Sequence, residues 1–195
     1  MNLTYKEIIN IMDANAGYLS MDTPENLYKF LCNITDVYRG SIVEFCYNDL
    51  KYPLLDKLEK LPGGTFWECN LNFNTWTAGS QVIQIDSFAF QGCKLDAVDL
   101  SNAKITELST MAFYNTYVKK VILPEGLKKI GEKVFQNSKL EEVYIPSTVE
   151  SIGKESFAYC TKLQKVHLCK DSIAQNKLKI DKDDFAIIKP KVVLY

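Results

Sequence analysis

The residue pair best suited to covalent chemistry is His167 and Cys169, because an imidazole close to a thiol can generate a nucleophilic thiolate. His167 is the only histidine in the chain. Two residues apart on one face of a strand corresponds to about 7 Å between Cα atoms, and the sequence shows no third group to orient the imidazole. We therefore expect His167 to be an exposed surface histidine, and we expect no catalytic residues and no enzymatic activity.

Metal and cofactor sites are not indicated. The chain has no CxxC pair, no GxGxxG loop and no P-loop motif. Asp181, Asp183 and Asp184 resemble a calcium-binding loop only in part, because the later glycine and glutamate of such a loop are missing. We expect a solvated turn there, and we expect the protein to use no metal and no cofactor.

The cysteines are expected to be reduced. An even number of cysteines suits disulfides in an exported protein, and this chain has six, at Cys32, Cys46, Cys69, Cys93, Cys160 and Cys169. Lys6, Glu7 and Asp13 interrupt the apolar stretch that a secretory signal would need, and no segment is apolar over the length of a membrane span. We therefore expect a cytoplasmic protein in which most cysteines act as small apolar core residues.

Composition excludes several function classes. The chain has 195 residues, of which 47% are hydrophobic and 24% are charged, and its net charge is −1. These values are typical of a soluble globular protein and disfavour a strongly basic nucleic-acid binder. Arg39 is the only arginine, whereas specific readers of nucleic acid rely on arginine. We expect neither a nucleic-acid partner nor a membrane partner.

Residues 1–62 have the pattern of a helical region. Thr4 and Glu7 fit a capping box, and Thr23-Pro24-Glu25 is a second helix start. Four leucines at Leu54, Leu55, Leu58 and Leu61 predict a last short helix before Pro62-Gly63-Gly64. We place a domain boundary at that proline and glycine segment.

Residues 63–195 contain an internal repeat of 22–23 residues, with four clear copies over residues 83–168. A phenylalanine recurs at one position of each copy, as Phe90, Phe113, Phe135 and Phe157. Each copy also carries a Val-x-Leu or Val-x-Ile segment, which predicts a strand with two residues facing inward and one outward. One copy cannot bury its own apolar residues, so the copies must stack into a solenoid with a parallel sheet. Degenerate end repeats are expected at residues 67–73 and 178–195.

Two further positions of the repeat have predicted roles. A small residue recurs as Cys93, Thr116, Ser138 and Cys160, which gives the two cysteines a packing role. Gly131 and Gly153 also share one position of the repeat, and we expect a turn with unusual backbone angles there.

The segments LEEVYIPSTVESIG, from Leu140 to Gly153, and VKKVILPEGLKKIG, from Val118 to Gly131, resemble the BspA-type leucine-rich repeat. The resemblance covers roughly residues 65–195. It implies a short curved solenoid with a parallel sheet, and it implies a protein-binding surface, since family members mostly act in that way. The overall expectation is an α+β repeat protein in which a helical N-terminal region precedes a leucine-rich-repeat solenoid.

The candidate binding residues are those that flank the inward pair of each strand. The central outward position carries Ile122, Tyr144 and His167, where a purely solubilising surface would use lysine or glutamate. Exposed apolar and aromatic groups ringed by charge are typical of interface anchors. The predicted partner-binding set is Asp99, Lys120, Ile122, Glu142, Tyr144, Lys165 and His167.

The sequence thus favours a non-enzymatic module that binds an unidentified protein partner through its sheet face. One alternative is a small phage or mobile-element inhibitor of a host defence enzyme, similar to an anti-CRISPR protein, acting by steric occlusion. Another is a structural subunit of a larger assembly, in which copies of the chain self-associate through the open ends of the solenoid.

Overall fold

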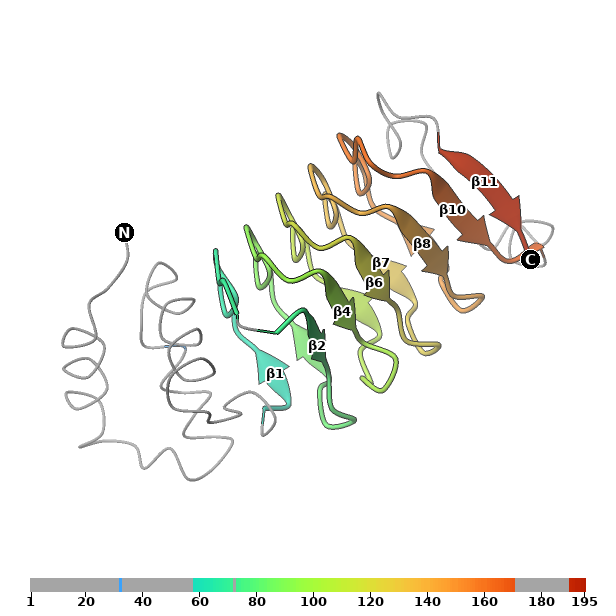
Figure 1. Ribbon diagram of the computed structural model, residues 1–195. Helices are drawn as coiled ribbons and strands as arrows, with labels where there is room; N and C mark the ends of the chain where they lie inside the picture. Colours follow the sequence, from blue (N-terminus) through green and yellow to red (C-terminus); the bar gives the residue numbers. More distant parts are fainter. Residues whose placement is uncertain (1–31, 33–57, 72, 171–189) are drawn as a thin grey trace, which may run out of the picture.

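The computed structural model describes residues 32, 58–71, 73–170 and 190–195 (Figure 1). Almost all of these residues belong to a parallel β-solenoid. Its larger sheet has six strands, in the spatial order β11-β10-β8-β6-β4-β2. These strands are β2 (Thr75–Thr77), β4 (Ala97–Asp99), β6 (Lys120–Ile122), β8 (Glu142–Ile145), β10 (Lys165–Leu168) and β11 (Lys191–Leu194).

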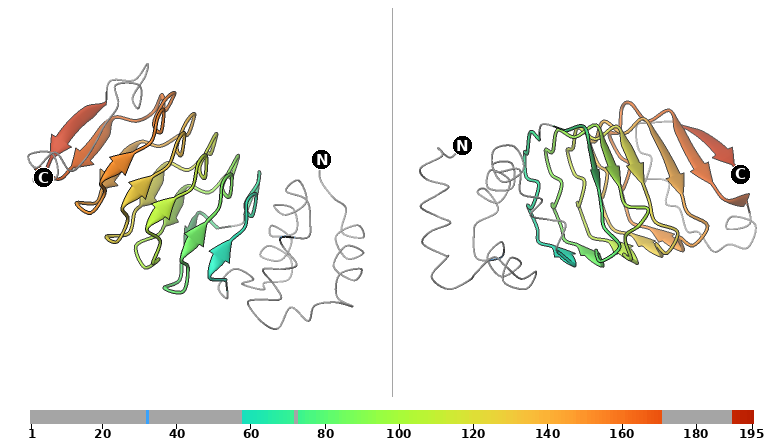
Figure 2. Two further views of the ribbon diagram at one scale, coloured as in Figure 1. Left: turned by 180° about the vertical axis from the view of Figure 1, so that it is seen from behind. Right: turned by 60° about the horizontal axis from the view of Figure 1, so that its bottom comes forward.

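Two-residue strands form the second side of each coil. One group is the three-stranded sheet β5-β7-β9, and the other is the pair β1-β3. Their bounds are β1 (Lys60–Leu61), β3 (Gln84–Ile85), β5 (Glu107–Leu108), β7 (Lys129–Ile130) and β9 (Ser151–Ile152). Because the chain alternates between the two sides, successive coils follow one another in a regular stack, which Figure 2 shows from two further sides.

The repeat of 22–23 residues places equivalent residues in lateral register. Val98 pairs with Val121 and Val121 with Val143, so the inward-facing residues form continuous columns across the large sheet. All three valines are buried. The parallel sheet and the alternation predicted for residues 83–168 are therefore confirmed.

A stack of phenylalanine rings fills the interior. Neighbouring ring centroids are 4.6 Å apart for Phe90 and Phe113, and 5.3 Å apart both for Phe113 and Phe135 and for Phe135 and Phe157. The planes of Phe90 and Phe113 differ by only 5°. All four rings are fully buried, so each coil is stabilised chiefly by its neighbours.

Gly131 and Gly153 owe their places to close packing, and the prediction of unusual backbone angles there was wrong. The positive-φ glycines of the described residues are Gly64 and Gly92. A Cβ at Gly131 would lie 2.6 Å from the Leu108 carbonyl oxygen, and one at Gly153 would lie 2.6 Å from the Glu132 nitrogen. Adjacent coils therefore approach so closely at these two residues that glycine is required there, whereas the equivalent positions of the two preceding coils carry Asp86 and Ser109.

Positive φ occurs instead at two positions of the turn that surrounds each phenylalanine. At the second of these, φ is 66° at Gly92, 53° at Asn115, 59° at Asn137 and 61° at Tyr159. Glycine and asparagine are the residues that adopt this conformation most readily. Tyr159, like Glu68 in the first coil with φ of 51°, is therefore a strained member of a column that otherwise carries glycine and asparagine.

Of the predicted N-terminal helices, the structure describes Cys32, which has helical backbone and is exposed, and the last few residues. There the structure corrects the sequence reading, because Lys60–Leu61 is strand β1, which pairs with β3, and not part of a helix. The opening strand predicted at residues 67–73 was also misplaced. It is β2, at Thr75–Thr77, and Trp67 and Glu68 lie in the preceding turn.

An additional coil therefore precedes the four repeats predicted from the sequence. Phe66 stacks on Phe90 with centroids 4.5 Å apart, and Leu61 pairs with Ile85. Cys69 is buried at the position equivalent to Cys93. The division into domains at residues 62 and 63 stays a prediction.

At the other end, β11 has the predicted register. Val192 pairs with Val166 and Leu194 with Leu168, as the degenerate last repeat requires. The two β11 side chains are nevertheless 50% and 46% exposed, respectively. The remainder of the predicted end repeat, including the three aspartates, lies outside the described residues.

Three cysteines have the expected packing role. Cys69, Cys93 and Cys160 are buried as part of the core. The Cys160 thiol donates to the Phe135 carbonyl oxygen at 2.9 Å and lies 3.2 Å from the Ser138 hydroxyl. Burial raises the pKa of the Cys160 thiol, so this cysteine is an inert core residue.

Candidate functional site

The outward residues of the large sheet form a column that crosses its strands. Asp99 lies beside Ile122, and Tyr144 lies beside His167, in the register of the paired strands. Ile122 is 38% exposed and Tyr144 is 54% exposed. The prediction that these positions point away from the core is confirmed for both residues.

His167 is on this face but is covered, and the expectation of an exposed histidine was wrong. Its ring stacks on Tyr144 with centroids 3.8 Å apart and planes within 8°. Its Nε2 atom lies 2.6 Å from Glu142 Oε1, and the residue is only 9% exposed. The large tyrosine on the neighbouring strand covers one face of the imidazole, so His167 supports Tyr144 rather than meeting solvent.

A row of charged residues runs beside the column, at the amino ends of the strands. Lys120 lies beside Glu142, and Glu142 lies beside Lys165. Lys165 Nζ is 3.6 Å from Glu142 Oε1. The hydrogen bond with His167, and to a lesser degree the charge of Lys165, holds the pKa of Glu142 below its ordinary value. The Glu142 carboxylate therefore contacts the side chains of both Lys165 and His167.

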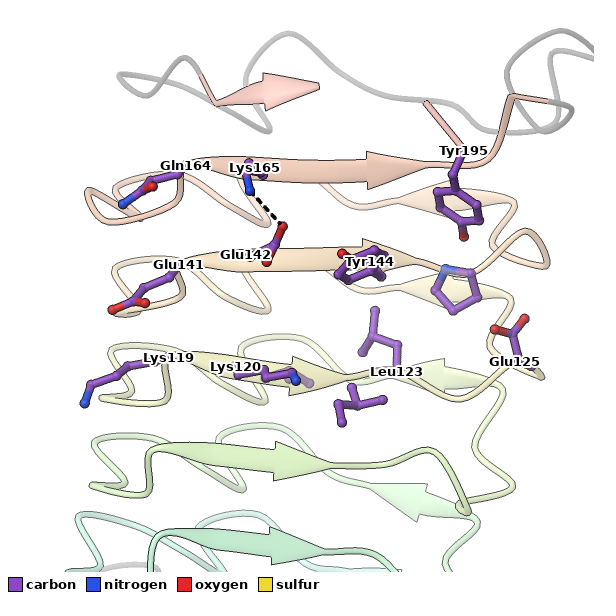
Figure 3. A pocket seen from close by; sticks show the side chains of 13 residues that line it. Lys119, Lys120, Leu123, Glu125, Glu141, Glu142, Tyr144, Gln164, Lys165 and Tyr195 are labelled. Carbon is purple, nitrogen blue, oxygen red and sulfur yellow. Dashed lines mark ion pairs between the residues drawn. The ribbon is translucent and has the colours of Figure 1, made fainter. Parts of the chain in front are cut away.

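A groove of about 540 Å³ lies over these strands. Figure 3 shows lysine and glutamate side chains at the end where the strands begin, and Tyr195 and Glu125 at the end where they finish. The lining residues are Lys119, Lys120, Val121, Ile122, Leu123, Glu125, Glu141, Glu142, Tyr144, Pro146, Gln164, Lys165 and Tyr195. The groove thus combines a charged end with an apolar and aromatic end.

Tyr195 closes the aromatic end of the groove. Its hydroxyl donates to the Ile145 carbonyl oxygen at 2.9 Å, and its ring centroid is 6.4 Å from that of Tyr144. Partial burial raises the pKa of Tyr195, and Cys169 and Glu125 raise it further. Tyr195 directly follows strand β11, and its side chain therefore crosses the neighbouring strand β10 to reach Ile145 on β8.

Five of the predicted binding residues line the groove together: Lys120, Ile122, Glu142, Tyr144 and Lys165. Asp99 and His167 do not line it. The Asp99 carboxylate instead accepts a hydrogen bond from the Ser101 backbone N–H at 2.9 Å, and His167 lies behind Tyr144. These positions show geometry only, and a role in binding stays a prediction for all seven.

Sequence reasoning missed Tyr195 and Glu125 as members of the same site. A signal for Tyr195 was present in the repeat. Leu194 is in register with Leu168, so Tyr195 occupies the repeat position that Cys169 occupies in the preceding coil. No sequence signal indicates that the Tyr195 side chain folds back over β10.

His167, which was weighed above with Cys169 for covalent chemistry and not expected to be catalytic, has Glu142 as its side-chain partner. The imidazole is hydrogen-bonded to Glu142, and among the described residues no hydrogen bond joins it to the Cys169 thiol. Within the same part of the chain, no group of three or more metal-ligating side chains is close enough to hold an ion. Nor do these residues include a helix that is long and apolar enough to cross a membrane.

Comparison with known protein families gives one match over most of the chain. Residues 44–180 match the family described as "BspA type Leucine rich repeat region", with six copies of the repeat. No curated protein gives a significant match.

Three bacterial proteins are among the solved structures to which the chain is similar. A leucine-rich cell surface protein from Faecalibacterium prausnitzii is 21% identical, with a TM-score of 0.48 over 51% of this chain and 27% of that one. The pneumococcal vaccine antigen PcpA is 23% identical, with a TM-score of 0.43 over 48% and 28%, respectively. The T. pallidum leucine-rich repeat protein is 22% identical, with a TM-score of 0.36 over 49% and 59%. The chain therefore spans about a quarter of the length of the first two.

Proposed function

The chain belongs to the family of BspA-type leucine-rich repeat proteins, and from that premise we propose that it recognises a protein partner through the outer face of its large sheet. Repeat proteins of this kind are in general non-enzymatic binding modules. The observation that carries the proposal is the groove, which brings Ile122 and Tyr144 together among charged residues. Apolar anchors within a polar rim are the usual arrangement of interface hot spots.

The two parts of the groove have different proposed roles. Tyr144 and Ile122 supply apolar area that a partner can cover, and Tyr144 is held upright by its stack on His167. A ring fixed in this way loses little conformational freedom on binding. Lys120, Glu142 and Lys165 form the rim, where charges set the orientation of the partner more than its affinity.

A photocrosslinking experiment tests this proposal in the native host. Benzoylphenylalanine is placed at position 144 in one variant and at position 159 in another. Tyr159 is 48% exposed but lies in the turn before β10 and does not line the groove. We expect a specific crosslinked protein from position 144 and none from position 159. The same crosslinked protein from both positions, or from position 159 alone, would contradict a site on the sheet face.

One observation favours a second candidate, self-association through the C-terminal end of the solenoid. Val192 and Leu194 of β11 are about half exposed, although they stand in register with the buried residues Val166 and Leu168. An edge strand that exposes apolar side chains can pair with another chain. Light scattering over a range of concentrations tests this, and Val192→Lys should abolish any increase in mass.

The narrower forms of the proposal have their own tests. Steric inhibition of a host defence enzyme would require the chain to bind a purified nuclease effector and block its substrate. A cytoplasmic location, which would keep the cysteines reduced, is tested by fractionation of native cells. Failure of either test would leave recognition by the sheet face as the broader proposal.

A further inference from the structure

The aromatic end of the groove is a distinct subsite, formed by Ile122, Glu125, Tyr144, Pro146 and Tyr195 (Figure 3). Tyr195 and Tyr144 make a tilted pair with an angle of 54° between their ring planes. One face of Tyr144 is covered by His167 at 3.8 Å. Because β8 lies between β10 and β6, the other face of Tyr144 is on the side of β6, where Ile122 lines the same groove.

The charges at the other end of the groove are largely satisfied by one another. Lys119 Nζ lies 2.6 Å from Asp96, and Glu142 contacts both Lys165 and His167. Lys120 and Glu141 are opposite in sign and offset each other. This end therefore offers little net preference for a partner of either charge.

The aromatic end is different, because among the described residues that line it Glu125 is the one with a charged side chain. Glu125 is exposed, and among the described residues its carboxylate makes no ion pair. Figure 3 places the Glu125 side chain at the end of the groove where the strands finish, the same end as Tyr195. A carboxylate without an ion-pair partner among the described residues thus shares this end with two aromatic rings and an apolar floor.

Resting on the proposed function, we infer that this subsite takes a basic side chain of the partner protein, arginine or lysine. The methylene groups of such a side chain would cover Ile122 and Pro146, as long cationic side chains do on apolar surfaces. The cationic head would face the free side of Tyr144, which favours a cation. Glu125 would complete the site by pairing with the same head.

An acidic or purely apolar side chain fits less well. A carboxylate would face both the negative face of an aromatic ring and Glu125, and both contacts are repulsive. An apolar side chain would leave Glu125 partly desolvated without a partner, at a cost in free energy. The arrangement therefore discriminates by charge as well as by shape.

The test uses two short peptides and the full chain. The probes are acetyl-Gly-Arg-Gly-amide and acetyl-Gly-norleucine-Gly-amide, and the observables are the NMR signals of the Ile122 methyl groups and the Tyr144 ring. We expect saturable shifts with the arginine peptide, and binding of the norleucine peptide that is weaker by about two- to fivefold, the range for a half-exposed ion pair. Equal affinity for both peptides would overturn the inference.

A matched pair of variants locates the charge effect. Glu125→Gln should weaken the arginine peptide about two- to fivefold without changing the amide spectrum elsewhere. Glu150→Gln is the control, because Glu150 pairs with Lys128 and does not line the groove, and it should leave the affinity unchanged. An unchanged affinity in Glu125→Gln would overturn the inference.

The cation subsite and the proposed function can fail independently of each other. If position 144 crosslinks to a partner and Glu125→Gln leaves the binding of that partner unchanged, the inference falls and recognition by the sheet face stands. If the arginine peptide requires Glu125 but position 144 captures no protein, the cation subsite stands and the proposed function falls.

Discussion

The interior of the solenoid and its outer sheet face are built from the same repeats but differ in how they use them. Inside, phenylalanine rings follow one another at 4.5–5.3 Å from Phe66 to Phe157. Outside, the equivalent positions of successive strands carry Asp99, Ile122, Tyr144 and His167. Close packing of the interior requires a side chain of the same volume at the same position of every coil. An outward position places no such requirement on its side chain.

This difference indicates where function can be located. A residue that repeats is explained by its packing, so it needs no further role. A residue that departs from repetition on an exposed face has no packing reason, and it is a candidate for binding. The groove lies over β6, β8 and β10, where the outward positions carry Ile122, Tyr144 and His167.

The largest expected effect is a loss of stability from the interior. Phe113→Ala removes the central ring of the stack, and we expect the free energy of unfolding to fall by about 3–5 kcal/mol. Urea denaturation followed by circular dichroism measures this. A loss below about 1 kcal/mol would show that the rings do not hold the coils together.

The close approach of coils at Gly153 gives the next effect. Gly153→Ala forces a Cβ to within 2.6 Å of backbone atoms, and overpacking of this kind costs about 1–3 kcal/mol. Gly126→Ala is the matched control, since nothing lies within 4 Å of its Cβ, and it should stabilise by about 0.4–1 kcal/mol. Equal effects of the two substitutions on the urea midpoint would contradict this account.

A smaller effect, of opposite sign, is expected in the turns. Tyr159 has φ of 61°, where the equivalent residues of the two preceding coils are Asn137 and Asn115. The amide of Asn137 donates to the side-chain oxygen of Asn115 at 2.8 Å. Tyr159→Asn should therefore relieve strain and extend this contact, raising stability by about 0.5–1 kcal/mol. A lower melting temperature would be the contrary result.

The smallest effect concerns the pKa of Glu142 on the outer face. In His167→Ala the hydrogen bond that lowers this pKa is lost, so the pKa should move up toward its ordinary value. Because the folded pKa is depressed, the carboxylate stabilises the wild-type fold above the ordinary pKa, and this contribution is lost as the pH falls through the folded pKa. Carboxyl ¹³C NMR titration measures the shift, and an identical titration in both proteins would contradict the described hydrogen bond.

The interior could be predicted from the sequence because each buried position of the repeat recurs in several copies with the same residue type. The register of Phe90, Phe113, Phe135 and Phe157 was sufficient for the parallel solenoid. The first coil was missed for two reasons. Leu58 and Leu61 also fit a helical spacing. In addition, the segment between the buried cysteine and the first inward residue of the strand is two residues longer from Cys69 to Trp76 than from Cys93 to Val98.

The outer face could be predicted only in part. The strand alternation placed Ile122 and Tyr144 correctly, but it could not show that Tyr144 covers His167 or that Tyr195 reaches the Ile145 carbonyl. Those contacts depend on side-chain size and on the path of a single terminal segment, and neither recurs in the repeat.

The most direct test of the central claim is a quantitative affinity capture from native-host lysate with wild type, Tyr144→Ala and Tyr159→Asn side by side. Both variants lose one exposed tyrosine, and thermal unfolding of each establishes that the solenoid is intact. Recognition by the sheet face predicts a partner that is retained by wild type and by Tyr159→Asn and lost by Tyr144→Ala. A partner retained equally by Tyr144→Ala would contradict the claim and place binding elsewhere on the molecule.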